Sequence, residues 1–241
     1  MKTVLITGAS QGIGAATAEA FWEAGWHVGL LARSRNKLDT LAKDRAATVL
    51  EADVTDEAAV DAAFAEFADA VGRLDVLFNN AGMFGPSGPL DEIPLDGWKQ
   101  VMDVNINGMF LAARAAFRQM RVQNPQGGRI INNGSLSAHV PREGSAAYST
   151  SKHAISGLTK TISLDGRPFD IACGQIDIGN ARTAMVEDLN ERRAREGLSV
   201  LPSMDVKAAA DAVVHMAGLP HEANVQTLTV MATKMPFIGR G

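Results

Sequence analysis

The sequence predicts an α/β fold, a single domain in which a doubly wound parallel sheet of seven strands carries helices on both faces. Short apolar runs alternate with longer helical patterns along the whole chain, and the apolar runs are nearly continuous, as in strands that are covered on both faces. No linker, repeat or low-complexity tract divides residues 1–241. The predicted strands are Val4–Thr7, Val28–Ala32, Thr48–Glu51, Val76–Asn79, Arg129–Asn133, Ile171–Ile176 and Thr227–Met231.

Amphipathic stretches with helical spacing lie between these strands. The predicted helices are Ile13–Glu23, Asn36–Lys43, Ala58–Val71, Val104–Met120, Ala147–Leu164 and Lys207–Met216. One polar region, from Gly179 to about Asp205, shows no such pattern, and we expect it to be irregular. Loops of that length in a compact domain usually serve function, so we interpret residues 180–205 as a substrate lid. A solvated surface insertion is the alternative.

Composition narrows the class of protein. The 241 residues are 46% hydrophobic and 21% charged, which is ordinary for a globular enzyme. A net charge of -4 argues against a nucleic-acid partner held by a broad basic surface. The single cysteine, Cys173, permits no internal disulfide and favours a reducing compartment. No stretch reaches the ~20 apolar residues of a membrane span, the histidines lack metal-ligand spacing, and we expect a cytoplasmic enzyme without a metal.

A glycine-rich turn follows the first predicted strand and opens the first predicted helix. This placement aims the free N–H groups of a helix N-terminus at the turn, where a pyrophosphate would bind. Glycines permit the tight turn, the close approach of a ligand and the packing of helix against strand. The candidate cofactor-binding residues here are Gly8, Ser10, Gln11, Gly12, Ile13 and Gly14.

The end of the second predicted strand bears on the choice of dinucleotide. An acidic residue there would bind the 2′-hydroxyl of NAD, but this chain has Arg33, Ser34 and Arg35. Guanidinium groups bind phosphate strongly, so NADP(H) is favoured over NAD(H). Asp53, after the third strand, is a candidate contact to adenine, with a helix N-cap as the alternative.

Tyr148 and Lys152 lie four positions apart in a predicted helix and therefore share one face. A nearby cation lowers the pKa of a phenol, which would let Tyr148 protonate a carbonyl oxygen in reduction and remove the proton in oxidation. Ser135 follows the fifth strand, where its hydroxyl could hold the substrate oxygen. Ser137 is its rival, and either serine could be a turn cap.

Taken together, these segments resemble the short-chain dehydrogenase/reductase family over almost the whole chain. The resemblance rests on Thr7-Gly8-Ala9-Ser10-Gln11-Gly12-Ile13-Gly14, the pair Asp53-Val54, Asn79-Asn80-Ala81-Gly82, Asn105, Ser135 and the Tyr148-x-x-x-Lys152 pattern, in the family's order. It implies a Rossmann-type sheet of order 3-2-1-4-5-6-7. It also implies homodimers or homotetramers formed through the helices at Val104–Met120 and Ala147–Leu164.

The resemblance further implies a mechanism and a site. Tyr148 would be the general acid/base, Lys152 would bind the nicotinamide ribose and lower the pKa of the tyrosine, Ser135 would orient the substrate oxygen, and Asn105 would support a water relay. Further cofactor contacts are implied at Val54, Asn80, Ala81, Gly82, Ile178, Gly179 and Thr183. The implied activity is hydride transfer between NADP(H) and a small carbonyl or secondary alcohol, as in 3-oxoacyl-thioester reductases or other ketone reductases.

Two segments depart from the family pattern. Ile178-Gly179 stands where the family usually has a Pro-Gly pair, so the stiffness of that loop is in question, and the neighbouring Asp177 is also unusual. The tail Lys234–Gly239 is partly apolar and is expected to pack against a neighbouring subunit or on the surface. Arg182, Arg192, Arg193 and Arg195 in the expected lid hint at an anionic substrate.

Two other functions compete with this interpretation. A regulatory or scaffolding module would bind NADP(H) without turnover, but it would be expected to lack the serine, tyrosine or lysine, all of which are present. An epimerase or dehydratase with a permanently bound cofactor would be expected to carry a larger C-terminal domain than the roughly ninety residues that follow Lys152.

Overall fold

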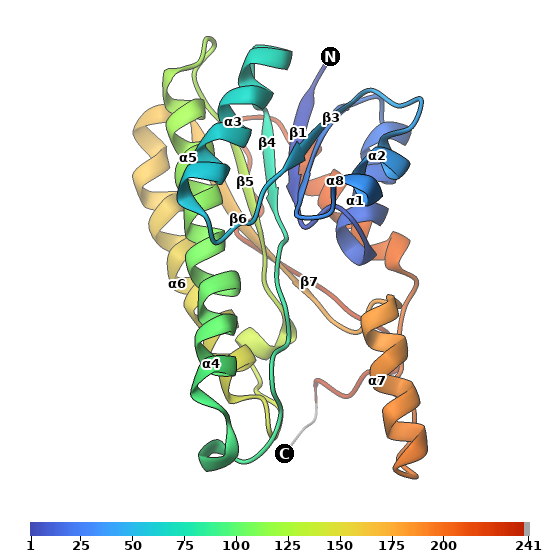
Figure 1. Cartoon of the computed structure of the whole chain (residues 1–241). Coiled ribbons are helices and arrows are strands. Elements are labelled where there is room, and N and C mark those ends of the chain that lie inside the picture. The colour runs from blue at the N-terminus through green and yellow to red at the C-terminus, as the bar shows by residue number, and fades with distance from the viewer. Residues whose placement is uncertain (239–241) are drawn as a thin grey trace.

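The computed structural model describes residues 1–238, apart from the side chain of Met185. Its centre is one sheet of seven parallel strands in the order β3-β2-β1-β4-β5-β6-β7, which confirms the predicted topology (Figure 1). The strands are β1 (Thr3–Thr7), β2 (His27–Ala32), β3 (Ala47–Glu51), β4 (Val76–Asn79), β5 (Gly128–Asn133), β6 (Ile171–Ile178) and β7 (Thr227–Val230).

Helices cover both faces of the sheet, so each face carries its own apolar layer (Figure 1). Phe21 from α1 and Val213 from α8 pack on one face, and Phe67 from α3 and Ala116 from α5 pack on the other. This double covering explains why the strands read as continuous apolar runs. The main helices are α1 (Gly12–Glu23), α2 (Arg35–Ala42), α3 (Glu57–Val71), α4 (Leu95–Met102), α5 (Met109–Val122), α6 (Ala146–Gly166), α7 (Ala184–Arg195) and α8 (Val206–Gly218).

The helix predicted over Val104–Met120 differs from the observed one. The helical segment starts earlier, with α4, and passes through a π-helical stretch, η2 (Asp103–Gly108), before α5 begins at Met109. Gly97 inside α4 weakens the sequence signal, yet it is required because a Cβ there would lie 2.8 Å from Pro86 Cγ. The π-helical turn shifts the helix register where the segment passes the candidate site, a common place for such turns.

The expectation of an irregular segment from Gly179 to Asp205 was wrong over its middle part. Residues Ala184–Arg195 form α7, which lies apart from the two helix layers, at the lower right of Figure 1. The helix has no apolar stripe that would reveal it by spacing, but its Ala, Glu, Leu and Arg residues have high helix propensity. Glu187 in the first turn and Arg192, Arg193 and Arg195 in the last turn suit the helix dipole.

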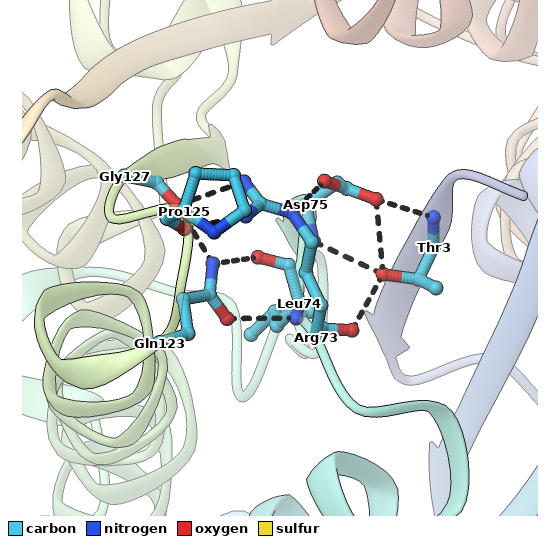
Figure 2. A network of polar contacts seen from close by, with 7 residues as sticks. All are labelled: Thr3, Arg73, Leu74, Asp75, Gln123, Pro125 and Gly127. Carbon is cyan, nitrogen blue, oxygen red and sulfur yellow. Dashed lines mark hydrogen bonds and ion pairs between the residues drawn. The ribbon is translucent and has the colours of Figure 1, made fainter.

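Figure 2 shows a polar network that joins β1 to the connections before β4 and β5. The side chain of Gln123 accepts the Leu74 N–H at 2.9 Å and donates to the Leu74 carbonyl at 2.9 Å and to the Gly127 carbonyl at 2.7 Å. Thr3 bonds Asp75 through its N–H at 2.8 Å, and Arg73 bonds the Asp75 carboxylate. The network satisfies backbone groups that the sheet ladder leaves unpaired, at the amino ends of the strands.

Within residues 1–238, the helices are too short or too polar to cross a membrane.

Candidate active site

A cleft lies at the carboxyl edge of the sheet, where the parallel strands end together. Its volume of about 520 Å³ suits a small-molecule ligand. Most of the predicted site residues line it, contributed by the ends of six strands, the turns that follow them and helix α6: Gly8, Ser10, Gln11, Gly12, Ile13, Arg33, Ser34, Asp53, Val54, Asn80, Ala81, Gly82, Ser135, Tyr148, Lys152, Ile178, Gly179 and Thr183. Gly14 and Asn105 are the two predicted residues that do not line it.

The glycine-rich turn after β1 forms a cradle of bare backbone. Gly8 and Gly12 have φ of +66° and +58°, a region that favours glycine. A Cβ on Gly14 would lie 2.3 Å from the Gly8 carbonyl oxygen, so Gly14 permits the packing of α1 against the turn rather than touching a ligand. Helix α1 begins at Gly12 and directs its free N–H groups to the cleft. This backbone fits the pyrophosphate of a dinucleotide.

Cationic residues line the end of the cleft beside β2 and β3. The Arg33 guanidinium lies 3.9 Å from the Asp53 carboxylate, with 76% of its side chain exposed. Arg35, by contrast, pairs with Asp39 at 3.7 Å and does not line the cleft. Asp53 is not the helix N-cap, because Asp56 caps α3 by accepting the Ala59 N–H at 3.1 Å.

Tyr148 and Lys152 both project from α6 into the cleft. The Lys152 ammonium lies 5.6 Å from the centre of the Tyr148 ring and donates to the Asn133 carbonyl at 2.7 Å. Because Lys152 is 4% exposed, desolvation lowers its pKa to about 8, while the Asp177 carboxylate acts in the opposite direction. A buried ammonium with a lowered pKa and no directly bonded carboxylate is typical of a functional site.

The pKa of Tyr148 is raised, mainly by desolvation. The Ser135 side chain and the charge of Arg142 act to lower this pKa, whereas Asp177 raises it further. The field that favours the phenolate therefore includes Arg142, a residue that sequence analysis did not select. Ser135 Oγ also accepts the Ser137 N–H at 3.1 Å, so this serine is both a turn cap and a neighbour of the phenol.

The comparisons with known proteins agree with this geometry. A family model of short chain dehydrogenases matches residues 2–194. The chain belongs to the short-chain dehydrogenase/reductase family. It is thus an oxidoreductase of a family that binds nicotinamide dinucleotides.

Relatives show a range of chemistry within this family. The 2-(R)-hydroxypropyl-CoM dehydrogenase of Xanthobacter autotrophicus is 36% identical over 230 residues, 90% of this chain and 91% of that protein. A structure of actinorhodin polyketide ketoreductase with NADPH superimposes with a TM-score of 0.88 and 25% identity over 96% of both chains. The 3-ketoacyl-(acyl-carrier-protein) reductase of Brucella melitensis, solved with NADH, has the same fold, with a TM-score of 0.85 and 24% identity over 96% of this chain and 97% of that one.

Asp177 lies near the end of β6, directly before the Ile178-Gly179 pair that departs from the expected Pro-Gly. Its carboxylate is fully buried and faces neither solvent nor the cleft. It accepts the Ser135 N–H at 2.8 Å and the Gln175 side-chain N–H at 2.7 Å, and its second oxygen lies 2.7 Å from His139 Nε2. Gly134 leaves room for it, since a Cβ there would lie 2.1 Å from Asp177 Oδ1. This network fixes the turn that carries Ser135.

Asn105 lies in the π-helical stretch η2, and its side chain is fully buried. The amide accepts the Met83 N–H at 2.8 Å and donates to the Met83 carbonyl at 2.9 Å and to Ser151 Oγ at 3.0 Å. It therefore ties the turn after β4 to helix α6. Its predicted part in a water relay stays a prediction.

Several residues that line the cleft had not been predicted individually as site residues: Lys37, Gln100, Asn133, Arg142, and, within the expected lid and tail, Val186 and Met235. Asn133 Oδ1 is buried without a hydrogen-bond partner while its amide group donates to Asn80 Oδ1 at 2.9 Å. The position of Asn133 at the end of β5, two residues before Ser135, is the signal that would have found it.

The four arginines of the expected lid and the C-terminal tail do not lie where the sequence suggested. Arg182, Arg192, Arg193 and Arg195 do not line the cleft, so they carry no argument for an anionic substrate. The tail lies against the cleft of its own chain through Met235, whose Sδ would lie 2.9 Å from a Cβ on Gly179. The predicted packing against a neighbouring subunit is untested.

Proposed function

We propose that the protein is an NADP(H)-dependent oxidoreductase that transfers hydride between nicotinamide and a carbonyl or secondary alcohol. The observation that carries this proposal is the convergence of Ser135, Tyr148 and Lys152 in the same cleft as the glycine cradle. When bound, the nicotinamide ring supplies or accepts the hydride. The chain's own residues bind the reactants, orient the substrate oxygen and move its proton.

Tyr148 is the proposed general acid/base. In reduction its hydroxyl protonates the carbonyl oxygen of the substrate, and in oxidation its phenolate accepts the proton of the alcohol. The Ser135 hydroxyl, held beside the phenol by the turn that Asp177 anchors, donates to the same substrate oxygen. Lys152 is proposed to bind the ribose next to the nicotinamide. The groups that act to lower the pKa of Tyr148 in this structure are Ser135 and Arg142, so the predicted lowering by Lys152 is not seen here.

NADP(H) is the proposed cofactor because cations gather at the adenosine end of the cleft. Arg33, Ser34 and Lys37 line this end, and no acidic residue comes directly after β2, where Arg33, Ser34 and Arg35 stand. The Lys37 ammonium lies 3.4 Å from Gln11 Oε1, so it reaches over the glycine turn. A 2′-phosphate would bind Arg33 and Lys37 by charge-assisted hydrogen bonds. Asp53 would accept a bond from the adenine amino group.

A ketone, such as a 3-oxoacyl compound, is the proposed type of substrate, and residues 180–205 are the proposed lid over it. Val186 of α7 lines the cleft, which supports a role for this segment at the substrate. We also propose that the enzyme is cytoplasmic and forms homodimers or homotetramers through α5 and α6. The single thiol, Cys173, is free and buried, and Phe110 on α5 is 47% exposed, which supports these two proposals.

Hydride transfer with NADPH to a panel of ketones tests the proposed activity, with Tyr148→Phe as the decisive variant. We expect the variant to lose at least about 100-fold in kcat, as removal of a general acid does, while NADPH still binds. Unchanged turnover in Tyr148→Phe would assign the acid/base role elsewhere. Binding of NADPH without hydride transfer to any carbonyl would instead support a regulatory module.

A further inference from the structure

The substrate end of the cleft, beyond Tyr148, is built by five separate parts of the chain. It combines the turn after β4, helix α4, the β5–α6 loop and the segment of α7 with the tail. The side chains that line it are Met83, Phe84, Gln100, Arg142, Val186 and Met235. All are apolar or neutral except Arg142.

Arg142 lies over the ring of Phe84, which in turn packs against the ring of Tyr148. Its guanidinium carbon lies 5.8 Å from the centre of the Phe84 ring, and that ring meets the Tyr148 ring edge-on at 4.8 Å. The loop that carries Arg142 is tied to the turn after β4, where the Gly88 N–H donates to the Gly144 carbonyl at 3.1 Å. These contacts hold the guanidinium at the substrate end rather than leaving it to extend into solvent.

Within residues 1–238, the Arg142 guanidinium has no opposite charge beside it. The one carboxylate among the described cleft-lining residues is Asp53, which lies at the adenosine end beside Arg33. Lys152 has the buried Asp177 behind it as a source of opposing charge. In residues 1–238 no carboxylate lies within 4.0 Å of the Arg142 guanidinium, and no hydrogen bond engages it.

We propose that Arg142 binds an oxyanion of the substrate, so that the enzyme acts on oxo acids and hydroxy acids in preference to neutral ketones and alcohols. A guanidinium offers paired N–H donors to a carboxylate, sulfonate or phosphate, and it does so most strongly where water is partly excluded. The partner charge that Arg142 lacks within residues 1–238 is then supplied by the substrate, a few bonds from the carbonyl held at Tyr148. This inference rests on the proposed function and names its substrate class.

Three oxo acids and their methyl esters test the inference: pyruvate, acetoacetate and levulinate place the carboxylate at increasing distance from the ketone. Each compound is titrated into the enzyme with NADPH, with nicotinamide fluorescence reporting binding and absorbance reporting turnover. The variant is Arg142→Gln, and the matched control is Arg192→Gln on the outer part of α7, which does not line the cleft. Arg142→Lys, which keeps the charge with one donor atom, guards against a folding defect.

We expect at least one acid to be preferred to its ester by about 10- to 100-fold in kcat/KM, the range of a hydrogen bond to a charged group. Arg142→Gln brings this ratio toward unity, mainly through KM, Arg142→Lys keeps part of it, and Arg192→Gln keeps all of it. Equal use of esters and acids by the wild type overturns the inference while the proposed function stands.

Different results would contradict the proposed function and the inference about Arg142. Binding of an acid that depends on Arg142, with no hydride transfer to any compound, supports the inference and contradicts the proposed function. Binding of none of the six compounds, or an equal loss of the ratio in Arg142→Gln and Arg192→Gln, overturns the inference.

Discussion

The Asp177 carboxylate accepts the backbone N–H of Ser135 at 2.8 Å, and this bond couples the end of β6 to the turn after β5. The carboxylate is fully buried, yet every bond that it makes serves the turn and its neighbours rather than solvent. A buried charge of this kind acts in two ways: it fixes the position of Ser135, and its field reaches Tyr148 and Lys152.

Asp177→Asn separates these two effects, because asparagine keeps the acceptor oxygen for Ser135 and removes the charge. Desolvation is the main cause of the raised pKa of Tyr148, and the Asp177 carboxylate adds to it, so the pKa should fall in the variant. Alcohol oxidation requires the phenolate, so its kcat/KM rises with pH as Tyr148 loses its proton. In the variant this rise should occur at lower pH. The pH profile of kcat/KM measures this, with the exposed Asp165→Asn on α6 as the matched control. A limb that moves to higher pH contradicts this account.

Lys152→Met should stabilise the cofactor-free protein while abolishing turnover. Burial lowers the pKa of Lys152 from 10.5 to about 8, a cost of about 3 kcal/mol for holding the charged form at neutral pH. Between about pH 8 and 10.5 the lysine is protonated in the unfolded chain but neutral in the native protein, so the native protein becomes more stable relative to the unfolded chain as pH rises. The stability that Lys152→Met gains over the wild type therefore shrinks as pH rises through that window. Thermal melts at pH 7 and pH 10 measure this. Lys160→Met, exposed on the same helix, should show no such gain.

Gln123→Met should destabilise the fold without affecting the site. The variant leaves the Leu74 N–H and carbonyl without the partner shown in Figure 2, at a cost of about 1–3 kcal/mol for each buried group. Urea unfolding measures the loss, and the exposed Gln126→Met in the same connection is the matched control. NADPH affinity should stay the same in both variants, because the network lies at the opposite edge of the sheet from the cleft. Equal stability of the two variants would show that water replaces the Gln123 amide.

The strands and the main site were predictable from the sequence because they depend on local patterns, whereas the strand order was implied by the resemblance to the family. Continuous apolar runs gave the strands, and the residues that follow them, such as Gly8, Asn80 and Ser135, necessarily meet at one edge of a parallel sheet. Tyr148 and Lys152 were predictable since a helix fixes their relative direction.

The other features of the site and of the fold depend on tertiary contacts that no local pattern reveals. Arg142 belongs to the cleft because its loop packs on the turn after β4, and nothing in its neighbouring residues indicates that contact. Asp177 was recognised as unusual, but only the fold shows that it is buried beneath Ser135. Helix α7 was missed because its apolar residues show no regular helical spacing in the sequence, so hydrophobic spacing carried no signal.

The central claim, that the cleft binds NADP(H) with its 2′-phosphate at Arg33, is tested most directly by titrating the protein with NADPH and NADH and recording nicotinamide fluorescence. Wild type is compared with Arg33→Ala and with Arg35→Ala, the neighbouring arginine that pairs with Asp39 outside the cleft. We predict that NADPH binds more tightly than NADH, that Arg33→Ala loses about 10-fold or more of this preference, and that Arg35→Ala keeps it. Equal or tighter binding of NADH by the wild type would contradict the cofactor assignment, and binding of neither would contradict the account as a whole.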